Sequence, residues 1–181
     1  TRKAEISMKI EFTPSRPDSA DVVAFVVTKK SFEGLEFAVD SPEQLMETAK
    51  LARFDGSAGQ SFLLIAAVGG KMARIILVGV GENETDEQKA GGIIVAKVLT
   101  SGAKSIAIHA ENLEGETAAN VAYGALLKSW RMDTYFTTKP KTQLPSVEEI
   151  TVVGAPATAS DAWPRYAAIA DGVELTKELV S

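Results

Sequence analysis

Residues 73–92 read ARIILVGVGENETDEQKAGG: an apolar run, then Gly79 and Gly81 two positions apart, then what looks like the start of a helix. The aliphatic and β-branched residues of the run favour a strand. Asp86 and Glu87 favour the first turn of a helix, because carboxylates interact well with its positive end. This order predicts a strand, a tight turn and a helix. It is also the outline of a phosphate-binding loop.

The phosphate-binding interpretation fails on the residues that such loops need. A dinucleotide-binding loop has a third glycine that lets helix and strand approach closely, and Glu84 stands at that position. Glu82 and Glu84 would also place carboxylates beside a diphosphate. A P-loop is excluded as well, because Gly70-Lys71 is followed by Met72 and not by serine or threonine. We therefore interpret the glycines as a tight exit from the sheet and predict that the loop holds no nucleotide.

Apolar segments predict further strands at residues 8–12, 22–28, 61–68, 105–110 and 148–154, with 35–39 (LEFAV) as a short edge strand. The runs 61–68 and 73–80 are separated by GGKM, which predicts a hairpin. Residues 22–28 are nearly all apolar, as expected for a strand that is covered on both faces. Residues 137–145 (TTKPKTQLP) have the composition of a linker, and we interpret them as a connection inside the domain, because a strand and a helix follow.

Four helices are predicted, at residues 41–54, 85–101, 116–130 and 161–181. Ser41 and Gln44 have the spacing of a capping box, and Thr85 and Gln88 repeat it. Strands that are apolar throughout alternate with these amphipathic helices. The sequence therefore predicts an α/β fold with a mixed, mostly parallel sheet and helices on both faces.

Composition narrows the class of protein. The chain has 181 residues, a formal net charge of −5 and no cysteine, which excludes disulfides, thiolate metal sites and a cysteine nucleophile. It contains no dense block of Lys and Arg, so the charge balance argues against a nucleic-acid partner. No apolar run reaches the roughly 20 residues that a membrane span needs. We expect a cytoplasmic protein without a membrane partner.

Few residues have the pattern of a catalytic or binding site. His109 is the only histidine and ends a predicted strand, where we interpret it as structural, because no nucleophile or second ligand lies near it in sequence. Trp130, Tyr135 and Phe136 could stack on a base or sugar, but packing is the simpler interpretation. No metalloprotease, hydrolase or aspartate-rich metal motif occurs. The sequence therefore predicts no catalytic, cofactor-binding or metal-binding residue.

The last predicted helix has an apolar stripe to bury, made of Tyr166, Ile169, Ala170, Val173 and Val180. The sequence stops at Ser181 without a glycine or proline to end the helix. We expect this helix to be a severed connection to another domain.

Three segments resemble leucyl aminopeptidases, the M17 family of cytosolic metallo-aminopeptidases. YAAIADGVELTKELVS (166–181) resembles the interdomain helix, RIILVGVGE (74–82) resembles a strand and glycine turn of the N-terminal domain, and YGALLKSWRMDTYFTTK (123–139) resembles the end of a helix in that domain. The order and spacing of these segments along most of the chain match those of the family. Departures from the family pattern occur at Trp130, Met132, Phe136 and Lys177-Glu178, and none touches a catalytic position.

The resemblance implies a macro-domain-like N-terminal domain over residues 1–160 and an interdomain helix over 161–181. The two divalent metal ions (Mn or Zn) and the catalytic residues of the family lie in a C-terminal catalytic domain that this chain lacks, so no site residue is carried over. The full-length protein would be a two-metal aminopeptidase that releases N-terminal residues, leucine preferred, from peptides. The domain would support a homohexamer and frame access to the active sites, and the chain alone would be inactive. A macro-like module that binds ADP-ribose or another nucleotide, and a DNA-binding domain, remain as alternatives.

Overall fold

The computed structural model describes residues 8–81, 83–135 and 145–180, without the side chains of 130–135 and 173–180. Six strands form one sheet in the order β1-β6-β5-β2-β4-β3. Their bounds are β1 Lys9–Thr13, β2 Val22–Val27, β3 Ser61–Val68, β4 Lys71–Gly79, β5 Ser105–His109 and β6 Glu149–Val153. All neighbours pair in parallel except β3 and β4, which form the predicted antiparallel hairpin. The predicted mixed, mostly parallel sheet is confirmed.

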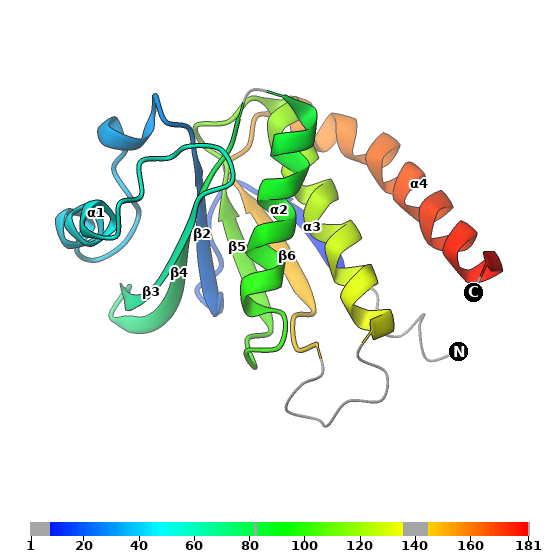
Figure 1. Ribbon diagram of the computed structural model, residues 1–181, viewed down its shortest axis with the longest axis horizontal. Helices are drawn as coiled ribbons and strands as arrows, with labels where there is room; N and C mark the ends of the chain where they lie inside the picture. Colours follow the sequence, from blue (N-terminus) through cyan, green and yellow to red (C-terminus); the bar gives the residue numbers. More distant parts are fainter. Residues whose placement is uncertain (1–7, 82, 136–144, 181) are drawn as a thin grey trace.

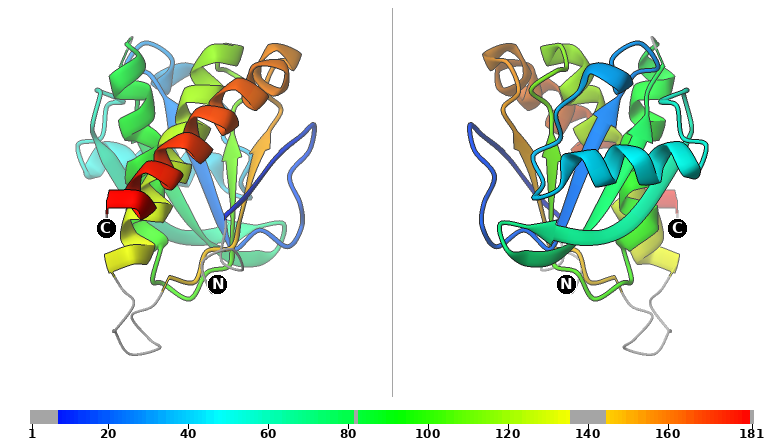
Figure 2. Two further views of the ribbon diagram at one scale, coloured as in Figure 1. Left: turned by 90° about the vertical axis from the view of Figure 1, so that its right-hand side faces the viewer. Right: turned by 90° about the vertical axis from the view of Figure 1, so that its left-hand side faces the viewer.

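Helices cover both faces of this sheet (Figure 1). The helical elements are η2 Phe32–Gly34, α1 Pro42–Leu51, α2 Glu84–Val98, α3 Gly115–Tyr135 and α4 Ala157–Val180. In Figure 1, α1 lies on one side of the sheet, and α2, α3 and α4 lie on the other. Figure 2 shows α4 on one side of the molecule and, after the opposite turn, α1 with the β3–β4 hairpin facing the viewer. The predicted α/β layering is therefore confirmed.

The central strand β2 explains why both faces need cover. All six of its residues, VVAFVV, are buried. Ala24 and Val26 belong to a core shared with α2 and α3, whereas Val23, Phe25 and Val27 belong to a core shared with η2 and α1. A strand with two apolar faces is stable in water only when helices pack on both of them.

The segment predicted as a short edge strand, residues 35–39, is not a strand. It follows η2 as irregular chain, and the ring of Phe37 packs edge-on against Phe25, with ring centroids 5.1 Å apart. The next residue, Asp40, donates its N–H to the carbonyl oxygen of Ala67. Burying Phe37 therefore takes the place of strand pairing in this segment.

Both predicted capping boxes are wrong. Ser41 is the N-cap of α1, but its side chain accepts no cap hydrogen bond. The N-cap of α2 is Asn83 and not Thr85: its side-chain oxygen accepts a hydrogen bond from the N–H of Asp86 at 2.8 Å. Asparagine is among the strongest N-cap residues, so the helix begins at Glu84 and takes in Thr85.

The helices α2 and α3 approach each other more closely than side chains would allow. A Cβ on Gly91 would overlap the carbonyl oxygen of Val121, and a Cβ on Gly124 would overlap that of Gln88. Beside this contact, the carboxylate of Glu87 accepts hydrogen bonds from Thr117 at 2.8 Å and from the buried Asn120 at 2.9 Å. The two glycines thus set the distance between the helices, and Glu87 sets their register.

The predicted apolar stripe of α4 is only partly buried. Tyr166 and Ala170 are buried against Ala119, Tyr123 and Leu126 of α3. Ile169 is 50% exposed, so the prediction is wrong for this residue, because α3 covers only the adjacent face of α4. The side chains of Val173 and Val180, and the predicted linker apart from Pro145, lie outside the described residues.

Gly91→Ala is expected to lower the free energy of unfolding by about 1–3 kcal/mol, because the added methyl group must push α2 and α3 apart. The neighbouring Gly92 provides a matched control, since a Cβ there meets nothing closer than the Cβ of Lys128 at 3.8 Å. Gly92→Ala is expected to raise the stability by about 0.5–1 kcal/mol through helix propensity. Urea denaturation of both variants measures the difference. Equal effects would contradict the proposed close contact.

Candidate functional site

The strand order reverses at the boundary between β2 and β5. After β2 the chain crosses to the face covered by α1, and after β5 it leads to α3 on the opposite face. The crevice at the carboxyl ends of such strands is where open α/β sheets usually bind ligands. In this chain a cavity of about 470 Å³ lies there, and its lining includes Phe25, Phe37, His109 and Glu111. This crevice is therefore the candidate functional site.

Three side chains from two segments of the chain meet beside the cavity. The guanidinium of Arg16 donates a hydrogen bond to Nε2 of His109 at 2.9 Å and another to the carbonyl oxygen of Ala38 at 2.9 Å. Because Arg16 has no acceptor, Nε2 must be the unprotonated nitrogen, and Nδ1 carries the proton. That proton is donated to the carboxylate of Glu111, with distances of 2.9 and 3.0 Å to its two oxygens. The neutral imidazole also stacks on Phe25, with ring centroids 4.8 Å apart.

This network gives His109 a structural role. Burial lowers its pKa below the ordinary value, and the nearby Arg16 adds to the effect, whereas Glu111 opposes it. Both ring nitrogens are engaged by the protein itself, so neither is available to move a proton to or from a ligand. His109 and Arg16 thus join the 14–20 loop, the segment after η2 and the end of β5.

The sequence identified only part of this network. His109 was placed at a strand end, as found, but Arg16 and Glu111 were missed. Glu111 lies two residues after His109 and could have been found from that spacing. Arg16 is 93 positions away from His109 and had no signal in the sequence.

The glycine turn that follows β4 is explained by contacts within the chain. A Cβ on Gly79 would overlap the carbonyl oxygen of Ser57, so this position needs glycine to admit the loop that follows α1. A Cβ on Gly81 would overlap the carboxylate of Asp86. The carboxylate therefore occupies space beside the turn, at the start of α2, where an anionic ligand would have to sit. Glu84 is exposed, and Glu82 lies outside the described residues.

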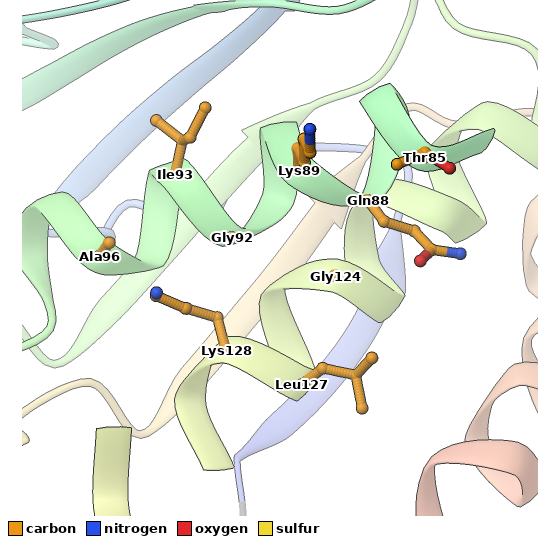
Figure 3. A pocket seen from close by; sticks show the side chains of 9 residues that line it. All are labelled: Thr85, Gln88, Lys89, Gly92, Ile93, Ala96, Gly124, Leu127 and Lys128. Carbon is orange, nitrogen blue, oxygen red and sulfur yellow. The ribbon is translucent and has the colours of Figure 1, made fainter. Parts of the chain in front are cut away.

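A second surface cavity, of about 380 Å³, lies between α2 and α3 (Figure 3). Gly92 and Gly124 leave room for it, and Ile93, Ala96 and Leu127 give it an apolar lining. Lys89 and Lys128 are its charged residues. Among the residues that line it, none combines burial with a polar group turned toward a ligand, so the geometry points to no particular chemistry.

A metal site and a membrane-spanning helix are two further possibilities. Within residues 8–81, 83–135 and 145–180, no three His, Cys, Asp or Glu side chains gather in a group that could hold a metal ion. Among the described helices, none combines the length and the hydropathy that a membrane span requires. The side chains of Trp130 and Tyr135, and all of Phe136, lie outside the described part of the chain.

Comparison with known proteins identifies the family. The cytosol aminopeptidase family, N-terminal domain, matches residues 22–139. A probable cytosol aminopeptidase of Caulobacter vibrioides is 32% identical over 189 residues, which cover 96% of this chain and 37% of that protein. The chain belongs to the cytosol aminopeptidase family. A second relative with the same description, from Rhizobium etli, is 34% identical over 83% of this chain and 32% of its own length. The chain thus spans about a third of the length of these cytosol aminopeptidases.

Solved structures agree on the fold. A mutant of tomato leucine aminopeptidase superposes with a TM-score of 0.71 and 22% identity, covering 96% of this chain and 38% of that one. The bottromycin maturation enzyme BotP, solved in complex with Mn, superposes with a TM-score of 0.56 and 22% identity, covering 84% of this chain and 30% of that one. The resemblance inferred from the sequence segments is therefore confirmed at the level of family and fold.

The buried state of His109 predicts a loss of stability in weak acid. The unfolded chain takes up a proton near the ordinary histidine pKa of 6.5, whereas the folded chain does so only at a lower pH. The contribution of His109 to the free energy of unfolding is therefore fully present above pH 6.5 and is lost as the pH falls through the pKa of the folded state. Because His109 is the only histidine, an NMR titration of its ring protons measures this pKa directly.

His109→Gln is the matched variant, because its side-chain amide can still accept from Arg16 and donate to Glu111 but does not titrate. We expect its free energy of unfolding to fall less than that of the natural chain between about pH 7.5 and about pH 5. Identical pH profiles for the two proteins, or a titration at or above pH 6.5, would contradict the buried network.

Proposed function

We propose that this chain is the non-catalytic N-terminal domain of a leucyl aminopeptidase. The observation that carries the proposal is the match of residues 22–139 to the N-terminal domain of the cytosol aminopeptidase family. The longer protein releases N-terminal residues, leucine preferred, from peptides. Two divalent metal ions, Mn or Zn, activate water and polarise the scissile carbonyl in a C-terminal catalytic domain.

The metal ions of this proposal have no ligand set among the described residues of the chain. The only histidine is engaged on both ring nitrogens, and the sequence contains no cysteine. No step of the reaction is therefore assigned to this chain. Its own residues build the sheet and α4, which packs on α3. In this proposal, residues 161–181 are the connection to the catalytic domain.

We propose that the domain helps the full-length protein to assemble and controls how peptides reach its active sites. It supports a homohexamer of the full-length protein in the cytoplasm and frames the entry of peptides to the active sites. The names of the relatives, cytosol aminopeptidases, support the compartment. The buried contacts between α3 and α4 support a fixed orientation at the start of the connecting helix, because Tyr166 and Ala170 hold α4 against α3.

The alternatives that the sequence left open find less support. An ADP-ribose or nucleotide site at the glycine turn would compete with the carboxylate of Asp86 beside Gly81. A DNA-binding domain would need a basic surface, and the net charge of the chain is −5. Isothermal titration with ADP-ribose and a salt-dependent gel shift with duplex DNA test these two alternatives separately.

The purified chain is expected not to hydrolyse leucine p-nitroanilide, with or without added Mn²⁺ or Zn²⁺, because its described residues contain no group of side chains that could hold a metal ion. The longer protein that contains the chain and the catalytic domain is expected to hydrolyse it, and a chelator is expected to abolish that activity. Release of p-nitroaniline, followed by absorbance, measures both.

Hydrolysis by the 181-residue chain that rises with protein concentration and disappears with chelator would contradict the assignment of the active site to the C-terminal catalytic domain. A longer protein that is inactive on leucine and other amino-acid p-nitroanilides would contradict the aminopeptidase proposal itself.

A further inference from the structure

The two edges of the sheet are built differently. Edge strand β1 carries Lys9 and Glu11, which form an ion pair at 2.8 Å, and such charges discourage pairing with another strand. Edge strand β3, Ser61–Val68, reads SFLLIAAV and carries no charge, proline or glycine over its whole length. An uncharged apolar edge of this kind is a template for strand addition.

The main-chain groups that β3 presents outward follow from its hairpin. Gly69 and Gly70 both have positive φ and form the two-residue turn between β3 and β4, with Val68 opposite Lys71. Residues flanking such a turn exchange hydrogen bonds, and bonded and non-bonded pairs then alternate along the ladder. The even-numbered residues of β3 therefore bond to β4, and the odd-numbered residues direct their N–H and C=O groups away from the sheet.

Contacts at one end of β3 agree with this alternation. The outward carbonyl oxygen of Ala67 accepts a hydrogen bond from the N–H of Asp40 at 3.2 Å. The carboxylate of Asp40 accepts hydrogen bonds from Gly69 and Gly70 at 2.7 and 2.8 Å. The chain thus closes the edge near the turn and leaves the outward groups of Leu63 and Ile65 without a partner among the described residues.

The side chains of the open part are unusually exposed for their type. Phe62, Leu64, Ala66 and Val68 pack toward α1, so Leu63 and Ile65 point to the opposite face of the sheet. Leu63 is 37% exposed and Ile65 is 62% exposed. Met72, which pairs with Ala67 on the same face, is 63% exposed. Solvent-exposed aliphatic side chains beside open main-chain groups indicate a surface that another strand covers.

We propose that the β3 edge pairs antiparallel with the β3 edge of a second copy of this chain. A two-fold axis perpendicular to the sheet at Leu64 places Leu63 of each copy opposite Ile65 of the other. Both residues have outward main-chain groups, so each such pair exchanges N–H and C=O groups across the axis. Their side chains then meet on one face and remove each other from water.

The surroundings of this edge suit a two-fold contact. A surface groove of about 540 Å³ runs between β3 and α1, and its lining includes Gln44, Thr48, Leu64 and Ile65. Although 24% of the residues in the chain are charged, none of those lining this groove carries a charge. Near a two-fold axis a residue faces its own copy, so any charge there would meet a like charge. The lack of charge in this groove favours a second copy over a charged peptide as the occupant. On the opposite face, Arg74 is the cross-strand neighbour of Ile65, and its guanidinium donates a hydrogen bond to the carbonyl oxygen of Ser101 at 3.4 Å.

Two variants test the pairing, one by removing a main-chain hydrogen bond and the other by adding a charge. Ile65→Pro removes an outward N–H at a position where an edge strand tolerates proline. Leu63→Lys adds a charge at the proposed contact. Each is expected to weaken association of the chain by about tenfold or more. Sedimentation over a concentration series measures this as the fraction at twice the 19.2 kDa mass of the chain. Leu51→Lys is the matched control, because Leu51 is 81% exposed but lies outside the groove.

Hydrogen exchange gives a second readout that does not depend on a variant folding. The amides of Leu63 and Ile65 are expected to exchange slowly in concentrated protein and rapidly in dilute protein, because the pairing covers them only in the dimer. A natural chain that stays monomeric at every concentration would overturn the proposal. A dimer that survives both substitutions, or amides whose exchange is independent of concentration, would overturn it as well. The pairing needs only this chain, so its outcome is separate from that of the aminopeptidase assay.

Discussion

Strand β2 is buried on both faces, and this burial determines where the helices of the domain must lie. Its main chain pairs with β4 on one side and β5 on the other, and all six of its side chains are buried. Helices must therefore cover both faces, so the connections that follow β2 and β5 leave in opposite directions. At the crevice that opens between them, Arg16 and Glu111 hold the imidazole of His109 through hydrogen bonds to its two ring nitrogens.

Close approach of main chains is the second constraint. Gly91 and Gly124 let α2 and α3 touch directly, and Gly79 lets the loop after α1 press against the end of β4. A side chain at any of these three positions would overlap a main-chain carbonyl oxygen and push the two segments apart. Gly79, which belongs to the turn that resembles a nucleotide-binding loop, therefore serves the packing of the domain, whereas the sequence predicted only a tight exit from the sheet.

Local patterns predicted the elements of the fold, and long-range contacts decided its details. Runs of aliphatic and β-branched residues identified every strand of the described sheet. The run is continuous in β2, which is buried on both faces, and is interrupted by Lys9 and Glu11 in the edge strand β1. The same logic failed for residues 35–39, where Phe37 belongs to a core that the local sequence does not reveal. Ser41 was predicted correctly as the N-cap of α1. The N-cap of α2 was misplaced, because Asn83 and Thr85 are both acceptable caps and only the course of the chain selects between them. At the crevice, His109 stood out by its rarity, whereas nothing local marks Arg16 as its partner.

The strand order separates two kinds of contact that the domain would make. Strand β1 lies at one edge of the sheet, and α4 packs beside it through Trp163, whose ring centroid is 5.7 Å from that of Phe12. Strand β3 lies at the opposite edge, with its uncharged main chain open to solvent. A catalytic domain that follows α4 and a second copy that pairs with β3 would therefore approach the sheet from opposite edges. Because Lys9 and Glu11 discourage pairing at β1, the charge pattern directs strand addition to the edge that lies away from α4. The sheet can thus hold one connection and one symmetric contact without competition between them.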